Sequence, residues 1–165
     1  MIEKAKDVNI LADEFSRREQ KAGLAEGFYK FLPIIETPSA LLHAHDIAQS
    51  GNGRNIGLML GTGDLFRLIN AESHSFLTLN FARNMVVMAC QSLSLAPIDT
   101  PYTKIKDKIG LEYDTRVAKK HGFTGKICLH PSQIEVVNEG LRPSVGDVQG
   151  WIFWPMRKRD SSFFG

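Results

Sequence analysis

Two acidic residues, Glu36 and Asp64, are the residues of this sequence best suited to chemistry. Each one closes an apolar run: Glu36 follows residues 32–35, and Asp64 follows residues 57–60 and a glycine-rich turn at 61–63. Mg²⁺ prefers oxygen ligands, and proteins often hold it with one or two carboxylates together with water and substrate oxygens. The pair therefore predicts a Mg²⁺ site, provided that the fold brings both residues to one rim.

Helix capping is an alternative role for the same two carboxylates. Asp64 could cap the helical piece that follows it. Glu36 precedes Thr37, which is the better capping residue because Pro38 then occupies the first helical position. Acidic residues after strands are more often structural than ligands, so the residue types alone leave metal binding and capping both open.

The turn Gly61-Thr62-Gly63 is a candidate binding element for an anionic group. Its backbone N–H groups lie near a helix start, where they could hold a substrate carboxylate, and glycine permits close approach to the backbone. An ordinary tight turn explains these residues equally well. The turn is neither a Walker loop nor a dinucleotide fingerprint, because it lacks their glycine spacing and the Lys-Ser/Thr pair.

The histidines give weaker signals. His43 and His45 are two positions apart on a predicted helix and so face different sides, which argues against a metal cluster with Asp46. We expect one of them at the surface and the other at the edge of the core. The sequence has no Gly-x-Ser-x-Gly elbow and no Cys/His nucleophile arrangement, so covalent acyl transfer has little support.

Strands that alternate with helices must position these residues. The apolar runs at residues 28–35, 56–60, 95–98 and 126–129 predict four strands, and each is followed by polar residues. Helical spacing predicts helices at residues 3–20, 37 to about 50, 74–93, 111–121 and 132–139, with a charged linker at 104–108. This order predicts an α/β fold of parallel β/α units with right-handed crossovers, whose site lies at the carboxyl ends of the strands.

Length and composition narrow the class of protein. The chain has 165 residues, 43% apolar and 23% charged, with a net charge of +2. This composition is typical of one globular domain, and the dispersed charges give no argument for nucleic-acid binding. No apolar run is long enough for a membrane span and no signal peptide is visible. Cys90 and Cys128 lie in apolar runs, which favours buried, reduced thiols and a cytoplasmic location.

Several longer motifs resemble the HpcH/HpaI aldolase superfamily, which includes the citrate lyase β-subunit. The resemblance covers about residues 2–148, and its joint pattern is far more specific than any one piece. It implies the C-terminal half of a (β/α)₈ TIM barrel over residues 1–148, followed by a divergent tail at 149–165. The runs that carry it are IIETPSALLHAHDIA (34–48), GLMLGTGDL (57–65), FARN (81–84), PIDTPY (97–102) and GFTGKICLHPSQI (122–134).

Membership of this family would imply a Mg²⁺-dependent carbon–carbon lyase. Its substrate would be a hydroxyacyl-CoA or acyl-carrier thioester such as citramalyl-, malyl- or citryl-CoA. A bound cation and directed N–H groups would stabilise the charge that develops as the bond breaks. The resemblance implies Mg²⁺ at Glu36 and Asp64, substrate carboxylate at Gly61, Thr62 and Gly63, and an acyl-CoA channel along Lys126, His130, Pro131 and Gln133.

The sequence departs from the family at both ends. A full barrel typically needs roughly 250 residues, and the family's substrate-binding arginine lies on strands that precede the matching region, so no catalytic residue can be assigned here. We expect a truncated or frame-shifted gene product, a hypothesis that the neighbouring genomic DNA would contradict if it held no further family segments.

Two alternatives to an active lyase therefore stay open. One is a catalytically incomplete fragment that at most binds metal or associates with a partner. The other is a small open-sheet regulatory domain that uses the rim near Asp64. Half a barrel would leave two strand edges and an inner sheet face without neighbours, so we expect a homo-oligomer or a complex with another chain.

Overall fold

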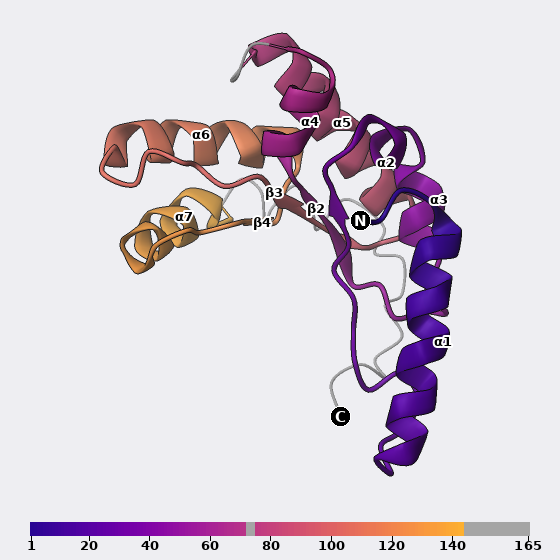
Figure 1. Ribbon diagram of the computed structural model, residues 1–165. Helices are drawn as coiled ribbons and strands as arrows, with labels where there is room; N and C mark the ends of the chain where they lie inside the picture. The colour runs from indigo at the N-terminus through magenta and orange to yellow at the C-terminus, as the bar shows by residue number, and fades with distance from the viewer. Residues whose placement is uncertain (72–74, 144–165) are drawn as a thin grey trace, which may run out of the picture.

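The computed structural model describes residues 1–71 and 75–143 (Figure 1). The predicted tail at 149–165 and the last residues of the predicted domain at 1–148 lie outside the described residues, so both boundaries stay predictions. The elements are α1 (Ala5–Lys21), β1 (Ile34–Ile35), α2 (Pro38–Leu42), α3 (Ala44–Gln49), β2 (Gly57–Leu60), α4 (Thr62–Leu68), α5 (Phe76–Ser92), β3 (Ala96–Asp99), α6 (Lys108–His121), β4 (Gly125–Lys126), the 3₁₀ turn η1 (Pro131–Gln133) and α7 (Ile134–Leu141).

The four strands form one parallel sheet in the order β1-β2-β3-β4. Strand order equals chain order, as expected for successive β/α units with short right-handed crossovers. Figure 1 shows the sheet crossing the middle of the molecule, with α1 at the β1 end and α6 and α7 at the β4 end. The predicted fold class, parallel β/α units, is therefore confirmed.

The two faces of the sheet differ in burial. Ile35, Leu58 and Leu60 are fully buried in a core that α2, α3 and α5 help to close. On the opposite face, Ile34 pairs in register with Met59, which pairs with Ile98. Ile34 is 41% exposed, and the other two are only partly buried. The sheet thus packs one face against helices and leaves an apolar row on the other.

The first strand is shorter than predicted because its amino half bonds to other partners. Only Ile34–Ile35 forms strand β1, although Phe31 makes an isolated parallel bridge to Asn55. Pro33 lies between them and has no N–H to donate to a neighbouring strand. Further upstream, the N–H groups of residues 27 and 29 donate to the carboxylate of Glu19 on α1 instead of to a strand.

Helix boundaries also differ from prediction. The helix predicted from residue 37 begins as expected, because Thr37 Oγ1 accepts the N–H of Ala40 at 3.0 Å and Pro38 follows. It breaks at His43 into α2 and α3, at a position with neither glycine nor proline to signal the break. Helix α6 begins earlier than predicted, at residue 108, because the Asp107 side chain caps it.

The two cysteines are free thiols, with Cys90 buried and Cys128 half-buried. Burial raises the pKa of the Cys90 thiol to about 11, so it stays protonated at neutral pH. Within the described residues, no helix combines the length and the apolar character that crossing a membrane requires.

A buried ion pair fixes α1 against the loop before β2. The guanidinium of Arg54 donates to both carboxylate oxygens of Glu19 at 2.7 Å and also to Ser16 Oγ, and both charged residues are at most 2% exposed. The hydrogen bonds from Arg54 lower the pKa of Glu19 to about 2; burial opposes this shift, and the N–H groups of Tyr29 and Gly27 add to it.

This pair predicts acid-sensitive stability. The folded-state pKa of Glu19 lies below its ordinary value of 4.5, so its contribution is complete above pH 4.5 and is lost as the pH falls towards 2. We expect Glu19→Gln to be less stable than wild type at pH 7, with a difference that narrows between pH 4.5 and 2. Thermal melts across this range measure it.

The matched control for the acid-sensitivity test is Glu14→Gln on the exposed face of the same helix. Glu14 pairs with Arg17 and Arg18, and all three side chains are at least 41% exposed. Exposed pairs contribute little, so this variant should follow wild type. A Glu19→Gln difference that stayed constant over the whole pH range would contradict the assignment.

Candidate functional site

Glu36 lies directly beside Gly61 at the carboxyl ends of β1 and β2. Ile35 pairs with Leu60, and the N–H of Gly61 donates to the carbonyl of Ile35 at 2.8 Å, so the residues that follow the two strands lie level with each other. A Cβ atom on Gly61 would stand 2.8 Å from Glu36 Cβ and 3.4 Å from Glu36 Oε2. The absence of a side chain at Gly61 is therefore what gives Glu36 its room.

Asp64 lies in the first turn of α4, three residues beyond Gly61. Gly61 occupies the N-cap position and no side chain caps the helix, so the capping role considered for Asp64 is not the one it plays. Its side chain is 44% exposed, and its Oδ1 lies 3.2 Å from Nη2 of Arg67, whose side chain is 70% exposed. An exposed pair of this kind is weak and can be displaced.

The chemistry of these two donors fits a hard divalent cation. Glu36 is partly buried, and its carboxylate makes no hydrogen bond or ion pair with any residue in the described ranges. Among the described residues, the carboxylate of Asp64 pairs only with the exposed guanidinium of Arg67. No cluster of three or more His, Cys, Asp or Glu side chains suited to a metal occurs among the described residues. The available set is thus two carboxylates, which matches the sparse protein ligation typical of Mg²⁺.

The histidines near this site take structural roles. His43 is half-buried, and its Nδ1 lies 2.7 Å from the carbonyl of Ser39. His45 is exposed and lies 3.7 Å from Asp46. One surface and one core-edge histidine were predicted, and this is confirmed.

Thr62 connects the turn after β2 to the end of β3. The Thr62 and Thr100 hydroxyl oxygens lie 2.7 Å apart and share a hydrogen bond. Thr100 directly follows Asp99, the last residue of β3, and is only 5% exposed. The Gly61–Gly63 turn is therefore braced from the neighbouring strand.

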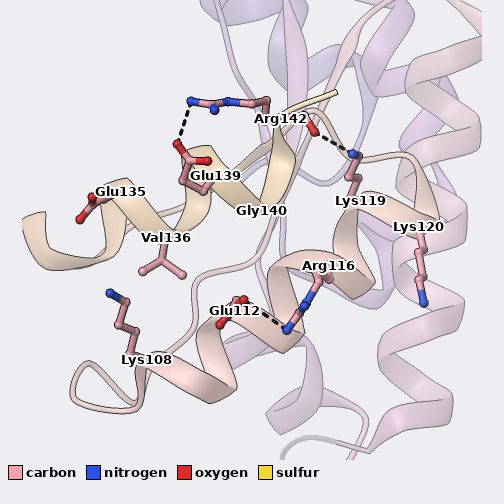
Figure 2. Close-up of a pocket in the computed structure, with 10 residues that line it drawn as sticks. All are labelled: Lys108, Glu112, Arg116, Lys119, Lys120, Glu135, Val136, Glu139, Gly140 and Arg142. Carbon is pink, nitrogen blue, oxygen red and sulfur yellow. Dashed lines mark hydrogen bonds and ion pairs between the residues drawn. The ribbon is translucent and has the colours of Figure 1, made fainter. Parts of the chain in front are cut away.

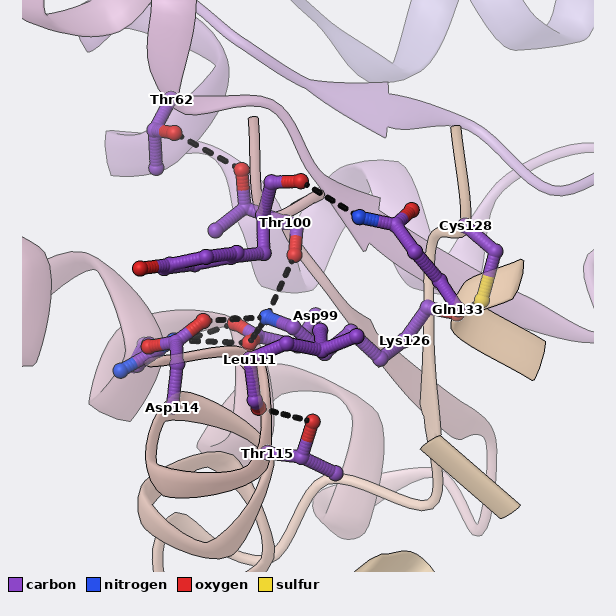
Figure 3. Close-up of polar contacts among 11 residues, drawn as sticks. Thr62, Asp99, Thr100, Leu111, Asp114, Thr115, Lys126, Cys128 and Gln133 are labelled. Atoms are coloured by element: carbon purple, nitrogen blue, oxygen red, sulfur yellow. Dashed lines mark hydrogen bonds and ion pairs between the residues drawn. The ribbon is translucent and has the colours of Figure 1, made fainter. Parts of the chain in front are cut away.

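Beneath this brace lie Asp99, Asp114 and Lys126 (Figure 3), which together with Arg83 form a largely buried cluster of four charged side chains. Arg83 donates from Nε and Nη2 to both oxygens of Asp99, at 2.9 and 2.7 Å, and from Nη2 to Asp114 at 2.8 Å. Lys126 Nζ donates to Asp99 at 2.7 Å and to Asp114 at 2.6 Å. Two cations thus balance two carboxylates in a cluster that meets solvent mainly at Asp114.

Electrostatics favour the charged forms of Asp114 and Arg83 in this cluster. Burial raises the pKa of Asp114, but the ammonium of Lys126 and the guanidinium of Arg83 outweigh it and hold that pKa below the ordinary value. Burial likewise lowers the pKa of Arg83, and its bonds to Asp99 and Asp114 reverse the effect and raise it. The hydrogen bonds among the four side chains tie the ends of β3 and β4 to α5 and α6.

The four residues predicted to line an acyl-CoA channel occupy two different environments. Lys126 and Gln133 are 7% and 1% exposed. Gln133 joins two loops, accepting the N–H of Leu129 at 2.8 Å and donating to the carbonyl of Tyr102 at 2.9 Å. His130 and Pro131 are exposed at the start of η1, where the His130 ring accepts the N–H of Ser132.

A separate groove of about 920 Å³ runs between α6 and α7 (Figure 2). Its walls are mostly charged and largely bonded to one another: Arg116 lies 3.3 Å from Glu112, and Arg142 lies 2.7 Å from Glu139. Lys119 donates to the carbonyl of Arg142. None of the predicted site residues lines this groove, which has the character of a solvated helix surface.

Sequence reasoning missed Arg83, Asp114 and the roles of Thr100. The available signal was a charged residue within an apolar stripe: Ala82, Val86 and Cys90 are buried on the same helix as Arg83. A buried arginine requires a carboxylate partner, and Asp99 stood at a strand end as the obvious one.

Comparison with known proteins places this geometry in a family. A sequence model of the HpcH/HpaI aldolase/citrate lyase family matches residues 1–131. The citrate lyase subunit beta of Haemophilus influenzae is 30% identical over 148 residues, which are 89% of this chain and 50% of that protein. The human mitochondrial citramalyl-CoA lyase is 30% identical over 151 residues, which are 87% of this chain and 44% of that protein.

A solved structure supports the same placement. The citrate lyase beta subunit of Mycobacterium tuberculosis, in complex with oxaloacetate and magnesium, superposes with a TM-score of 0.70 at 25% identity, over 86% of this chain and 59% of that one. The chain spans about half the length of the curated relatives it matches. Its four-stranded parallel sheet corresponds to part of their TIM-barrel-like fold. On the family match over most of its length, the chain belongs to the HpcH/HpaI aldolase/citrate lyase family.

Proposed function

We propose that this chain supplies the metal-binding part of a Mg²⁺-dependent carbon–carbon lyase that cleaves a hydroxyacyl-CoA or acyl-carrier thioester. The observation that carries the proposal is the placement of Glu36 against Gly61, with Asp64 in the next helical turn, at the strand ends of a chain from this family. A magnesium complex of a related citrate lyase beta subunit supports it.

In this proposal the chain's own groups bind and orient the substrate. Glu36 and Asp64 hold the cation, and the N–H groups of the Gly61–Gly63 turn receive a substrate carboxylate. Bound Mg²⁺ would supply Lewis-acid polarisation of the substrate oxygens. We infer that the exposed residues His130 and Pro131 meet the thioester carrier, while the buried Lys126 and Gln133 support that surface from beneath.

The remaining parts of such an enzyme would come from outside the described residues. Among the described residues, the two buried arginines, Arg54 and Arg83, are paired with carboxylates of the chain itself. A substrate-binding arginine from a further segment, a second copy or a partner chain is part of this proposal. The predicted cytoplasmic location fits CoA chemistry and stays a prediction.

Magnesium binding gives the direct test. We expect isothermal titration calorimetry with MgCl₂ to detect one site, and Glu36→Gln and Asp64→Asn each to weaken it by about tenfold or more, because each removes a charged ligand from a sparsely ligated cation. The control is Asp46→Asn, which changes the same charge on an exposed side chain of α3. Equal Mg²⁺ affinity in all four proteins would refute the assignment.

The pairing of the buried arginines Arg54 and Arg83 with carboxylates of the chain favours a second candidate function, a metal-binding fragment without lyase activity of its own. Incubation of the folded chain with Mg²⁺ and citramalyl-, malyl- and citryl-CoA separates the two. Acyl-CoA release supports the complete lyase; Mg²⁺ binding without release supports the fragment.

A further inference from the structure

We propose that Thr100 is a positioning residue for the turn that carries Asp64, and that Lys126 acts through Thr100 to hold that turn in place. This inference rests on the proposed function for its catalytic meaning, while the mechanical coupling itself can be tested without any ligand. It gives Lys126 an indirect role in place of the direct CoA contact predicted from the sequence.

The coupling follows a continuous path of short contacts. Lys126 Nζ donates to the backbone carbonyl of Thr100 at 2.7 Å. The hydroxyl of Thr100 shares its hydrogen bond with Thr62, also at 2.7 Å. Thr62 opens helix α4, and Asp64 lies two residues further on. A displacement of the Lys126 ammonium therefore reaches Asp64 through two hydrogen bonds and two residues of helix α4.

Lys126 has no proton left for a ligand. An ammonium group has three N–H donors, and here they meet three acceptors: Asp99, Asp114 and the Thr100 carbonyl. Direct contact with a CoA phosphate would break one of these buried bonds and leave a carboxylate or a carbonyl without its partner. The geometry thus assigns the lysine to the framework beneath the site.

The burial of Thr100 limits which groups its hydroxyl can bind. Its side chain is almost fully buried, so its hydroxyl must find a protein partner, and that partner belongs to the neighbouring strand end. The bond crosses from β3 to the segment after β2, which the backbone pairing of the two strands does not reach. The shared hydroxyl bond is thus the link between Asp99, the end of β3, and the α4 turn.

Hydrogen exchange of the ligand-free chain tests the coupling. We expect Thr100→Val to accelerate amide exchange at residues 65–68 of α4 by roughly threefold to tenfold, because losing one hydrogen bond lowers the cost of opening that helix. Thr100→Ser keeps the hydroxyl and should restore slow exchange. Lys126→Met should accelerate the same amides, with little further effect when combined with Thr100→Val.

Thr124→Val is the matched control for the exchange experiment. The Thr124 hydroxyl, just before β4, donates to the carbonyl of Pro97 at 3.3 Å, near the amino end of β3. Its removal should leave α4 exchange unchanged. Unchanged exchange in Thr100→Val, or equal acceleration in the valine and serine variants, would overturn the proposal. Since these two variants decide the result, it does not depend on whether Lys126→Met folds.

A binding measurement extends the test to the proposed site. With Mg²⁺ and oxaloacetate as probes, Thr100→Val should weaken the binding of Mg²⁺ and of oxaloacetate by roughly threefold to tenfold each, because the turn that it loosens carries the proposed ligand Asp64. Unaltered oxaloacetate affinity would contradict a role in ligand positioning. If the wild-type chain bound no Mg²⁺, the proposed function would fail, while the exchange data would still decide whether Thr100 holds the turn.

Discussion

Replacement of Asp99 by asparagine should destabilise the chain by about 3–5 kcal/mol, the cost typical of removing one partner from a buried ion pair. Asp99 is fully buried and accepts hydrogen bonds from both Arg83 and Lys126. Asparagine would keep the shape but leave two buried cations facing the single carboxylate of Asp114. At position 99 itself water cannot replace the lost charge, because Asp99 and the side chains of Arg83 and Lys126 are at most 2% exposed.

Urea unfolding followed by circular dichroism measures this loss for Asp99. The control is Asp46→Asn, which removes the same charge from an exposed side chain and should change stability by less than about 0.5 kcal/mol. A comparison variant, Asp114→Asn, should lie between the two, because that side chain is 19% exposed and water can reach it. A loss below about 1 kcal/mol in Asp99→Asn would show that the cluster is not a framework.

The second large effect is expected at Gly61. Gly61→Ala would place a methyl group 2.8 Å from Glu36 Cβ and 3.0 Å from Ile34 Cγ2. Something must shift, and overpacking of this kind costs about 1–3 kcal/mol. Because the displaced side chain is the proposed ligand Glu36, we also expect Mg²⁺ affinity to fall by about tenfold.

Gly63 supplies a control two residues away. A Cβ atom on Gly63 would meet nothing within 4 Å, and the residue lies in the first turn of α4. Gly63→Ala should therefore leave Mg²⁺ affinity unchanged and stabilise the chain by about 0.4–1 kcal/mol through the unfolded state. Calorimetry and urea unfolding of both variants give the comparison. Similar losses in Gly61→Ala and Gly63→Ala would mean that the turn responds to any side chain.

Much of the fold was predictable from the sequence because strands buried in a parallel sheet are continuous apolar runs. Strand number, order and direction follow from this pattern and from short connections. The length of β1 was not predictable, because residues 28–31 are as apolar as a strand. Only the Glu19 carboxylate, which arrives from α1, shows why their backbone groups bond elsewhere.

The candidate site was predictable to the extent that it depends on neighbouring strand ends. Adjacent strands bring Glu36 level with Gly61, and this follows from order and register alone. The charged cluster depends on how α5 and α6 pack on the sheet, since Arg83 and Asp114 come from those helices. Local sequence does not predict how these helices pack. The position of Lys126 at a strand end could therefore be predicted, but its partners Asp99 and Asp114 could not.

The Glu19–Arg54 pair bears on how α1 finds its place. An apolar helix face can slide by one turn against a smooth apolar surface at modest cost, because one methyl contact replaces another. Here a slide of one turn would bury a carboxylate and a guanidinium apart from each other, with two N–H groups of the adjoining loop also left without an acceptor. The pair thus fixes the register of the first helix: α1 can dock in one position, and positions shifted by a turn along the helix axis are disfavoured.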